Sequence, residues 1–359
     1  MLQNNKKGKE VIPGFKNWKV RLDESVDTEQ RIARVITVNK TNYNILIDGR
    51  EVLAEASGKL IYSSEGETDL PVAGDFVVAD VFDDLAIIHD VLPRFSFLKR
   101  KSAGKKVEFQ SIAANIDYGF IVQAIDTDFN IRRLERYLAM IYEADIIPVI
   151  ILTKTDLISE EEKEEKISLI EKNYNELKIF TVCNIDKNGI DEIINILEED
   201  KTYCFLGSSG VGKSTLINNL TGNENLATRE VRSSDKKGKH TTTRRELILL
   251  NNGSILIDTP GMRELANISI DDGLDETFYE ISELIKECKF SDCNHTSDSG
   301  CALLNAVDKG IVSRERYDSF IKLKKESEHY ESTYYEKKKK DKKFTKMCKT
   351  IMKEKSNKR

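Results

Sequence analysis

One stretch of the sequence has the residue types and spacing of a phosphate-binding loop. Residues 207–214 follow the pattern G-x-x-x-x-G-K-[ST]. The glycines allow a backbone to wrap a phosphate chain with its N–H groups pointing inward, and the N-terminus of a following helix adds partial positive charge. We expect nucleotide binding at Gly207, Ser208, Ser209, Gly210, Val211, Gly212, Lys213, Ser214 and Thr215. The alternative is a glycine-rich turn that binds nothing.

Several polar residues in and after this loop have distinct expected roles. Lys213 would reach the β- and γ-phosphates of a nucleotide, and the hydroxyl of Ser214 would bind Mg²⁺. A D-x-x-G pattern follows a predicted strand, so that Asp258 would hold Mg²⁺ and the N–H of Gly261 would face the γ-phosphate. In the polar, basic loop before it, the candidates for a Mg²⁺-binding switch threonine are Thr241 and Thr242.

A second loop, nearer the N-terminus, matches the base-recognition pattern N-K-x-D of GTPases. Its residues are Thr153, Lys154, Thr155 and Asp156. The Asp156 carboxylate would accept hydrogen bonds from N1–H and N2–H₂ of guanine, a donor pair that adenine lacks. Thr153 replaces the Asn whose amide ties this loop to the phosphate loop, and its hydroxyl could supply part of that contact. The alternative is a Lys–Asp pair that caps the helix predicted over residues 159–173.

Two further features bear on hydrolysis and specificity. The usual S-A element would lie near Val182-Cys183-Asn184, where the match is imperfect. Met262 follows Gly261, at the position where Ras-like proteins carry a water-orienting Gln, and Met cannot orient water. His240 is the nearest polar candidate for that catalytic role, since an imidazole can accept a hydrogen bond near neutral pH. The alternative is that His240 contacts a partner or is merely exposed.

Four potential metal ligands, three thiols and one imidazole, lie within a short segment near the C-terminus. They are Cys288, Cys293, His295 and Cys301. This ligand set suits a tetrahedral structural Zn²⁺ with no position left for water. The alternative is three buried thiols and a surface histidine. We interpret Cys183 and Cys204, outside this cluster, as small buried apolar residues.

The elements around the nucleotide motifs alternate between strand and helix. Strands are predicted over residues 118–124, 146–152, 179–182 and 203–206, and helices over 131–142, 159–173, 190–197 and 215–220. Residues 246–250 and 254–257 add a strand pair, and the whole predicts a mostly parallel α/β sheet. The base loop precedes the phosphate loop, whereas a standard GTPase has it last. The motif order therefore predicts a circular permutation.

The region before the sheet predicts a small β-barrel. Five short segments rich in Val, Ile and Tyr span residues 31–38, 43–47, 51–56, 75–81 and 86–92. An OB-fold, which often binds nucleic acid, is one candidate, and a purely structural barrel is the alternative.

Charge is unevenly distributed along the 359 residues, whose formal net charge is −5. Residues 337–359 contain 12 Lys/Arg and 2 Asp/Glu, a local charge of 12 − 2 = +10. Such a tail suggests either a polyanionic partner or a solvated end. The sequence contains neither an apolar run long enough for a membrane span nor a signal peptide, which predicts a cytoplasmic protein whose six cysteines are reduced or metal-bound.

Together these features resemble the RsgA/YjeQ family of bacterial GTPases that depend on the small ribosomal subunit. The specific marks are residues 113–117 (AANID), 210–214 (GVGKS), 239–243 (KHTTT) and 258–261 (DTPG). Departures are Thr153, the Cys183-Asn184 element, and Ala73 before Gly74, where the family usually has Val. The resemblance implies a multidomain fold: an N-terminal OB-fold β-barrel, a central α/β P-loop GTPase of circularly permuted motif order, and a C-terminal α-helical zinc-binding domain.

The resemblance also implies boundaries and partners. We expect a flexible lead-in (1–30), the barrel (31–93), a basic linker (94–107), the GTPase domain (108–267), the zinc-binding domain (268–335) and a basic tail (336–359). The implied function is subunit-stimulated hydrolysis of GTP to GDP during late maturation of the small (30S) subunit. The implied partners and cofactors are 16S rRNA, Mg²⁺ with GTP and one Zn²⁺, on a monomer that contacts no membrane. Two alternatives from the residues alone are a non-ribosomal GTP-dependent switch and an RNA-binding module with a vestigial GTPase.

Overall fold

The structure is a computed structural model that describes residues 12–21, 31–39, 42–101, 109–174, 176–222, 245–258 and 271–328. The chain forms two compact units, one of residues 1–100 and 110–265 and the other of residues 101–109 and 266–359. Within the described stretches, no helix combines the length and apolarity needed to cross a bilayer.

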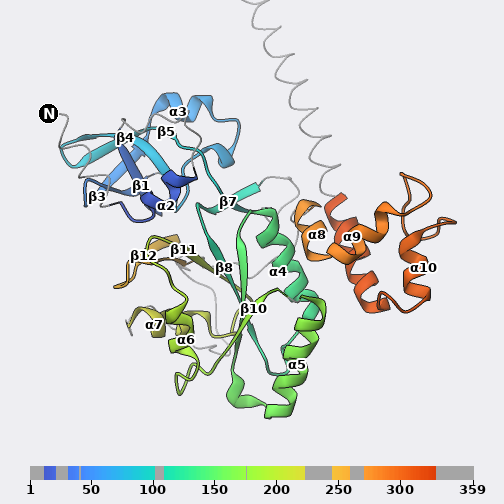
Figure 1. The fold of residues 1–359 in the computed structure, drawn as a ribbon. Helices are drawn as coiled ribbons and strands as arrows, with labels where there is room; N and C mark the ends of the chain where they lie inside the picture. Colours follow the sequence, from blue (N-terminus) through green and yellow to red (C-terminus); the bar gives the residue numbers. More distant parts are fainter. Residues whose placement is uncertain are drawn as a thin grey trace, which may run out of the picture. The chain divides into compact units, whose positions relative to one another are not determined.

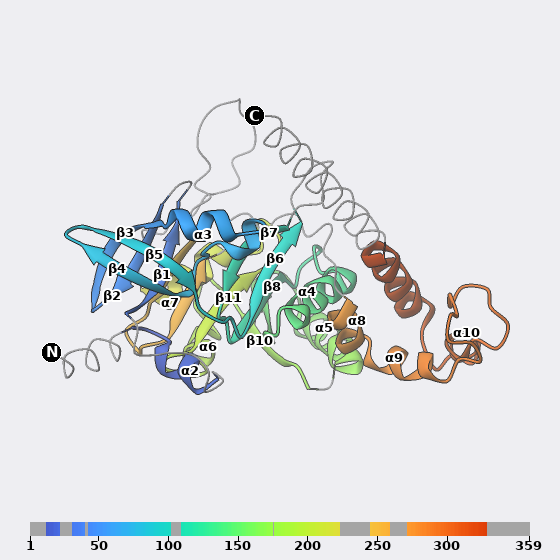
Figure 2. The same ribbon diagram turned by 90° about the horizontal axis from the view of Figure 1, so that it is seen from above.

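The first unit begins with a closed barrel. Its strands are β1 (Ile32–Val38), β2 (Tyr43–Ile47), β3 (Arg50–Ala56), β4 (Phe76–Phe82) and β5 (Leu85–Val91). They are ordered β1-β2-β3-β5-β4, and β4 pairs back with β1 to close the barrel. The β3–β5 pair is parallel and the remaining pairs are antiparallel. Helix α3 (Gly58–Ser63) connects β3 to the segment before β4 (Figure 2). This arrangement confirms the predicted OB-fold barrel.

Six strands form the α/β part of the same unit, and they are continuous with the barrel strands in one 11-stranded sheet. These six strands are β8 (Tyr118–Ala124), β9 (Ile147–Thr153), β10 (Lys178–Val182), β11 (Thr202–Leu206), β12 (Arg245–Leu249) and β13 (Ile255–Asp258). The order is β10-β9-β8-β11-β13-β12, with antiparallel pairing only between β12 and β13. Helices α4 (Ile131–Glu143) and α5 (Glu160–Asn173) cover one face, and α6 (Ile190–Asn195) and α7 (Lys213–Thr221) cover the other (Figure 1).

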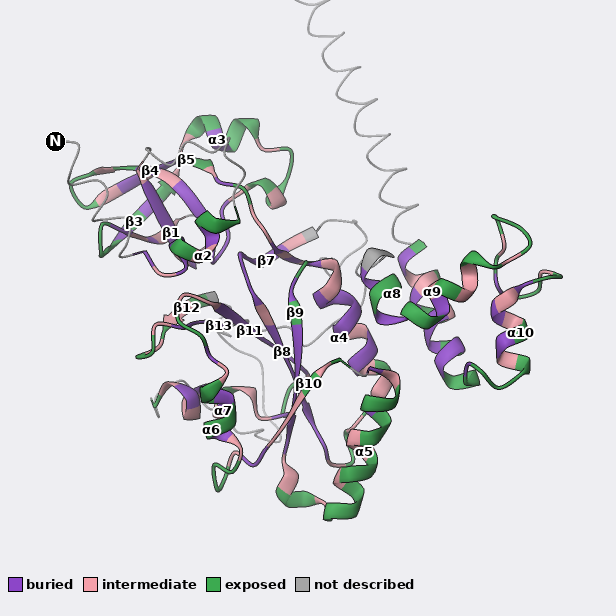
Figure 3. Ribbon diagram, in the orientation of Figure 1, coloured by how far each residue is buried: buried purple, intermediate pink, exposed green. Residues whose placement is uncertain are grey.

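Coverage of both faces explains the composition of the central strands. Every residue of β11 is buried, and β9 is buried beyond its first residue (Figure 3). Parallel strands between two helical layers therefore appear as continuous apolar runs rather than alternating ones. The base loop follows β9 and the phosphate loop follows β11, so the permuted α/β sheet is confirmed.

The predicted lead-in over residues 1–30 contains a packed helix, which is a difference from the expectation of flexibility. Helix α2 (Phe15–Val20) buries Phe15 and Trp18 against the barrel residue Phe76. The Trp18 and Phe76 rings have centroids 4.6 Å apart, and Trp18 Nε1 donates a hydrogen bond to the Pro93 carbonyl at 3.0 Å. Two buried aromatic residues thus stabilise a short helix that has no clear amphipathic period.

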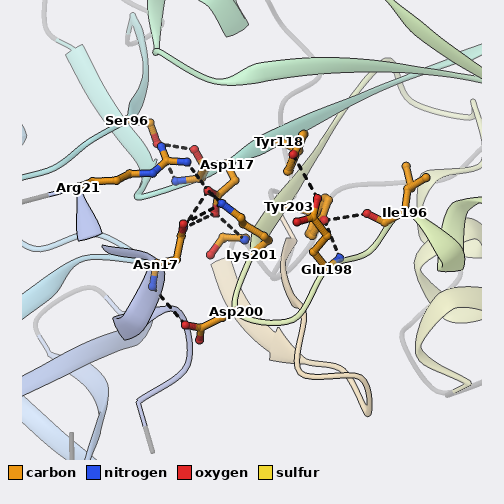
Figure 4. Close-up of polar contacts among 12 residues, drawn as sticks. Asn17, Arg21, Ser96, Asp117, Tyr118, Ile196, Glu198, Asp200, Lys201 and Tyr203 are labelled. Carbon is orange, nitrogen blue, oxygen red and sulfur yellow. Dashed lines mark hydrogen bonds and ion pairs between the residues drawn. The ribbon is translucent and has the colours of Figure 1, made fainter. Parts of the chain in front are cut away.

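A buried carboxylate joins this helix to the start of the parallel sheet (Figure 4). Asp117, which directly precedes β8, accepts hydrogen bonds from Asn17 Nδ2 at 2.9 Å and from the Thr202 N–H at 2.9 Å. Arg21 forms an ion pair with the same carboxylate at 2.8 Å, and Lys201 lies 3.3 Å from it. Asp117 belongs to the AANID motif of residues 113–117, and its contacts give this motif a structural role between α2 and the sheet.

Part of the predicted basic linker over residues 94–107 is ordered. Strand β6 (Phe97–Lys101) pairs with β7 (Phe109–Ala114), and residues 102–108 lie outside the described part. Arg94 forms an ion pair with the buried Asp75 at 2.7 Å and donates to the Thr68 and Leu70 carbonyls. Arg94 is therefore a structural residue of the barrel rather than part of a linker.

The second unit is mainly helical where the structure describes it, with turns over residues 287–301. Its helices are α8 (Asp271–Thr277), α9 (Tyr279–Lys286), α10 (Ala302–Asp308) and residues 314–328. Phe278 and Phe320 pack edge to face, with ring centroids 5.5 Å apart. The buried Arg316 donates to Glu280 at 2.7 Å and to the Thr277 carbonyl at 2.8 Å. The basic tail over residues 336–359 lies outside the described residues.

Candidate functional site

The phosphate loop lies at the carboxyl end of β11, directly before helix α7. Gly207, Gly210 and Gly212 have φ values of 148°, 80° and 94°. A Cβ atom at Gly207 would lie 2.2 Å from the Val122 carbonyl oxygen, so no other residue fits there without movement of the backbone. Lys213 Nζ donates to the carbonyls of Gly207 and Ser208 at 2.6 and 2.5 Å, which holds its ammonium group against the loop.

The base loop lies at the same edge of the sheet, because β9 and β11 run in the same direction on either side of β8. Thr153 is fully buried, and its hydroxyl donates to the Val211 carbonyl at 2.6 Å. The expected contact from the Thr153 hydroxyl to the phosphate loop is therefore present. Asp156 is exposed in the short 3₁₀ helix η2 (Thr155–Leu157) that follows.

The alternative interpretation of the base loop, a Lys–Asp pair capping the next helix, is wrong. Helix α5 is capped by Ser159, whose side chain accepts from the Glu162 N–H in a capping box. Lys154 instead forms an ion pair with Asp126 at 3.0 Å. Burial acts to raise the pKa of Asp126, but hydrogen bonds from the Asp128 N–H and from Lys154 outweigh it, so the pKa lies below its usual value.

The imperfect S-A element contacts both other loops. Cys183 is buried, as predicted, and its Sγ donates to Asp156 Oδ1 at 3.3 Å. Asn184 Nδ2 donates to the Gly212 carbonyl at 3.2 Å, and the Asn184 carbonyl accepts from Asn219 Nδ2 at 3.2 Å. The loops after β9, β10 and β11 are therefore joined to one another at this edge of the sheet.

A tyrosine that the sequence analysis did not single out also contacts the phosphate loop. Tyr137 of α4 is almost completely buried, and burial raises the pKa of its hydroxyl to about 12. A hydrogen bond with the Ser208 side chain acts in the opposite direction. The tyrosine thus stays neutral over the physiological pH range. No sequence pattern identifies it, because Tyr137 occupies an ordinary position on the apolar face of an amphipathic helix.

His240, Thr241, Thr242 and Gly261 lie outside the described residues. The backbone of Asp258 is described, as the last residue of β13, and β13 is parallel to β11. Asp258 therefore ends its strand at the same edge of the sheet as the phosphate loop, where a Mg²⁺-linked carboxylate would be needed.

The four predicted metal ligands meet in the second unit. All four ligand atoms lie within 4.8 Å of one another. Cys288 Sγ lies 3.7 Å from His295 Nδ1 and 4.0 Å from Cys301 Sγ, and Cys301 Sγ lies 3.8 Å from His295 Nδ1. A tetrahedral ion with bonds of about 2.3 Å to sulfur separates its ligand atoms by about 3.8 Å. The donor set therefore fits Zn²⁺.

Neighbouring groups orient the ligands of this cluster. The buried His295 has its carbonyl bound by the Tyr317 hydroxyl at 2.8 Å. Cys301 caps helix α10, and its Sγ accepts from the Leu304 N–H at 3.4 Å. Because His295 is 3% exposed, the alternative of a surface histidine is wrong.

Comparison with known proteins identifies the family. A family model described as "RsgA GTPase" matches residues 91–267, and one described as "50S ribosome-binding GTPase" matches residues 202–340. The chain is 39% identical over 328 residues to the "Small ribosomal subunit biogenesis GTPase RsgA 1" of Bacteroides thetaiotaomicron, covering 90% of this chain and 91% of that protein. The chain belongs to the RsgA GTPase family.

Solved structures agree on the fold. The crystal structure of YjeQ from Thermotoga maritima aligns with a TM-score of 0.62 at 23% identity, covering 83% of this chain and 98% of that one. The structure of YloQ, described as a circularly permuted GTPase, aligns with a TM-score of 0.59 at 22% identity, covering 86% of this chain and 98% of that one. As an RsgA-family protein, the chain is a GTP hydrolase with a permuted domain.

Proposed function

We propose that this GTPase binds the small ribosomal subunit in the cytoplasm and assists its late maturation, with GTP hydrolysis stimulated by the subunit. The observation that carries the proposal is the 39% identity over 90% of the chain to a relative named for small ribosomal subunit biogenesis. The match to the 50S ribosome-binding model covers residues 202–340 and includes the phosphate loop that GTPases share. This match therefore supports nucleotide binding rather than the choice of a particular ribosomal subunit.

The proposed nucleotide contacts follow from the loops at one edge of the sheet. Asp156 binds guanine through its exposed carboxylate, and Lys154 packs its stem against the base. The N–H groups of the phosphate loop and Lys213 bind the β- and γ-phosphates. Mg²⁺, held by Ser214, Asp258 and one of Thr241 and Thr242, would neutralise phosphate charge. Gly261 and His240 complete the proposal, with the Gly261 N–H toward the γ-phosphate and His240 orienting the attacking water.

The Cys/His cluster is proposed as a structural Zn²⁺ site. Cys288, Cys293, His295 and Cys301 would occupy all four positions of a tetrahedral ion, which leaves none for water. The ion would join the segment after α9 to the start of α10 and so shape that part of the second unit. The barrel and the basic tail supply further surfaces for 16S rRNA, and the chain acts as a monomer.

Two measurements test the proposed function. Small subunits are sedimented with the wild-type chain in GDP, GTP or a non-hydrolysable GTP analogue, and GTP turnover is measured with and without small subunits. We expect the tightest binding in the GTP state and faster turnover with subunits. The matched control is Asp156→Asn, which keeps the side-chain size but cannot accept both guanine donors. Absence of binding in every nucleotide state would favour a non-ribosomal switch, and binding without any turnover would favour an RNA-binding module.

A further inference from the structure

Two residues, one in the base loop and one in the loop after β10, contact the backbone of the phosphate loop. Thr153 stands where a base loop of the N-K-x-D type carries Asn, and its hydroxyl reaches the Val211 carbonyl at 2.6 Å. The neighbouring Gly212 carbonyl receives a different donor, the side-chain amide of Asn184, at 3.2 Å. An amide is therefore present at this junction, but it comes from the loop after β10.

The packing around these contacts allows little freedom. Thr153 and Val211 are at most 1% exposed. Asn184 is held in turn by Asn219 of helix α7, whose Nδ2 donates to the Asn184 carbonyl at 3.2 Å. A Cβ atom at Gly212 would lie 2.7 Å from Asn184 Nδ2, which shows how closely this side chain approaches the loop. Cys183, one residue earlier, contacts Asp156 at 3.3 Å and links the same β10 loop to the base-binding carboxylate.

We propose that Asn184 is a positioning residue that takes over the role of the Asn missing at position 153. Thr153 and Asn184 together hold the phosphate loop in its nucleotide-binding conformation. Their acceptors are consecutive carbonyls, so each bond restrains the same short segment before Lys213. Either bond alone preserves much of the restraint, and loss of both releases the segment. The proposal rests on nucleotide binding at this edge of the sheet.

The test is a set of variants in the full chain, with GDP dissociation constants as the first measurement. Thr153→Val removes the hydroxyl at nearly constant volume, and Asn184→Ala removes the amide. A hydrogen bond contributes about 0.5–1.5 kcal/mol, so each single variant should weaken GDP binding by about 2- to 12-fold. The double variant should lose more than the product of the two single losses, because the two bonds restrain the same segment.

The decisive variant is Thr153→Asn, which restores the amide to the base loop. In that background Asn184→Ala should weaken GDP binding by less than about 2-fold, since one amide then suffices. The matched control is Asn173→Ala. It removes another Asn amide that donates to a backbone carbonyl, that of Leu169 at 2.9 Å, but on the exposed end of α5. Its GDP affinity should equal that of the wild type.

A second measurement does not depend on nucleotide. Hydrogen exchange of the backbone N–H groups over residues 207–214 should be faster in the double variant than in either single variant, and normal in Asn173→Ala. If Asn184→Ala has the same effect with Thr and with Asn at position 153, and exchange in the loop is unchanged, the proposal is wrong although nucleotide binding stands. If the wild-type chain binds no guanine nucleotide, the proposed function fails instead, and this inference fails with it.

Discussion

Replacement of Asp117 should destabilise the first unit more than replacement of any exposed carboxylate there. The Asp117 side chain is 0% exposed, and its carboxylate accepts from Asn17, Arg21 and the Thr202 N–H. Thr202 itself is 1% exposed, so Asp117→Ala leaves a buried N–H without its acceptor. No metal or nucleotide contact is removed, and the effect should therefore appear as a loss of stability.

The magnitude can be estimated from these contacts. An unsatisfied buried N–H costs about 1–3 kcal/mol, and the Asn17 hydrogen bond contributes about 1 kcal/mol. Arg21 and Lys201 are 36% and 23% exposed and can recover water, so each adds at most about 1 kcal/mol. We expect Asp117→Ala to lower the free energy of unfolding by about 3 kcal/mol. Asp117→Asn keeps one acceptor oxygen for the Thr202 N–H and should cost about half as much.

Denaturant unfolding of the GDP-bound chain, followed by far-UV circular dichroism, measures this change. Asp128→Ala is the matched control, because Asp128 pairs with Arg133 but is 50% exposed, and its loss should cost less than about 1 kcal/mol. Limited proteolysis should also cut near α2 in Asp117→Ala before it cuts the sheet, since Asn17 and Arg21 lose their partner. Equal stabilities of Asp117→Ala and Asp128→Ala would refute the idea that this carboxylate fixes α2 to the sheet.

Three further predictions concern the nucleotide and metal sites. Asp156→Asn should weaken GTP binding and raise the preference for xanthosine triphosphate, because the O2 atom of xanthine can accept a hydrogen bond from the amide. Equal affinities of the wild type for GTP and ATP would contradict the assignment of the base loop. Cys293→Ser should abolish the zinc found by metal analysis and unfold residues 288–301, because structural zinc contributes on the order of 10 kcal/mol to the folding of its own site. The affinity for GDP should stay within about 2-fold of the wild-type value. The hydrogen bond from the Asp128 N–H and the ion pair with Lys154 lower the pKa of Asp126, so these two contacts stabilise the fold above the usual pKa of 3.8 and lose this effect as the pH falls through the lower folded-state value. The stability difference between wild type and Asp126→Asn should therefore shrink below about pH 4.

The sequence predicted the long periodic elements well because their apolar spacing reflects burial directly. The strand predicted over 118–124 has the bounds of β8, and the helix predicted over 131–142 is extended by one residue in α4. The predicted base and phosphate loops also meet, since parallel strands bring their carboxyl ends to one edge. Both results depend on local pattern and on a general rule of sheet geometry.

The missed features depend on long-range pairing. Helix α2 contains six residues, and its stability comes from packing of Phe15 and Trp18 against barrel residues distant in sequence. The side-chain partners of Asp117 come from positions 17, 21, 201 and 202, and no local pattern connects them with Asp117. The same holds for Asn184, whose imperfect motif gives no sign that its amide reaches the phosphate loop. Contacts with residues far away in the sequence mark all of these residues, and only the structure shows such contacts.

The strand arrangement has a consequence for coupling between the nucleotide site and the barrel. Strand β12 pairs with β13, with Glu246 opposite Asp258, and also with β1, with Glu246 opposite Thr37. Backbone pairing therefore connects Asp258, the proposed Mg²⁺ ligand at the end of β13, through Glu246 of β12 to Thr37 of the barrel strand β1. Slippage by one residue would turn every side chain of β12 to the opposite face, so the ladder resists local rearrangement.

Strand β1 is also fixed at the opposite edge of the sheet. The buried Arg34 donates to the Thr202 hydroxyl at 2.9 Å and to the Pro13 carbonyl at 2.6 Å, next to the Asp117 contacts. The barrel is thus attached both to the start of β11 and to β12, the strand that follows the predicted switch threonines. We expect binding of nucleotide by Thr241 or Thr242 to act on the barrel through β12, because β12 pairs directly with β1. Suppose that a partner of the barrel binds the GTP form more tightly than the GDP form by some factor. Linkage then requires that the bound partner raises the affinity of the chain for GTP relative to GDP by that same factor.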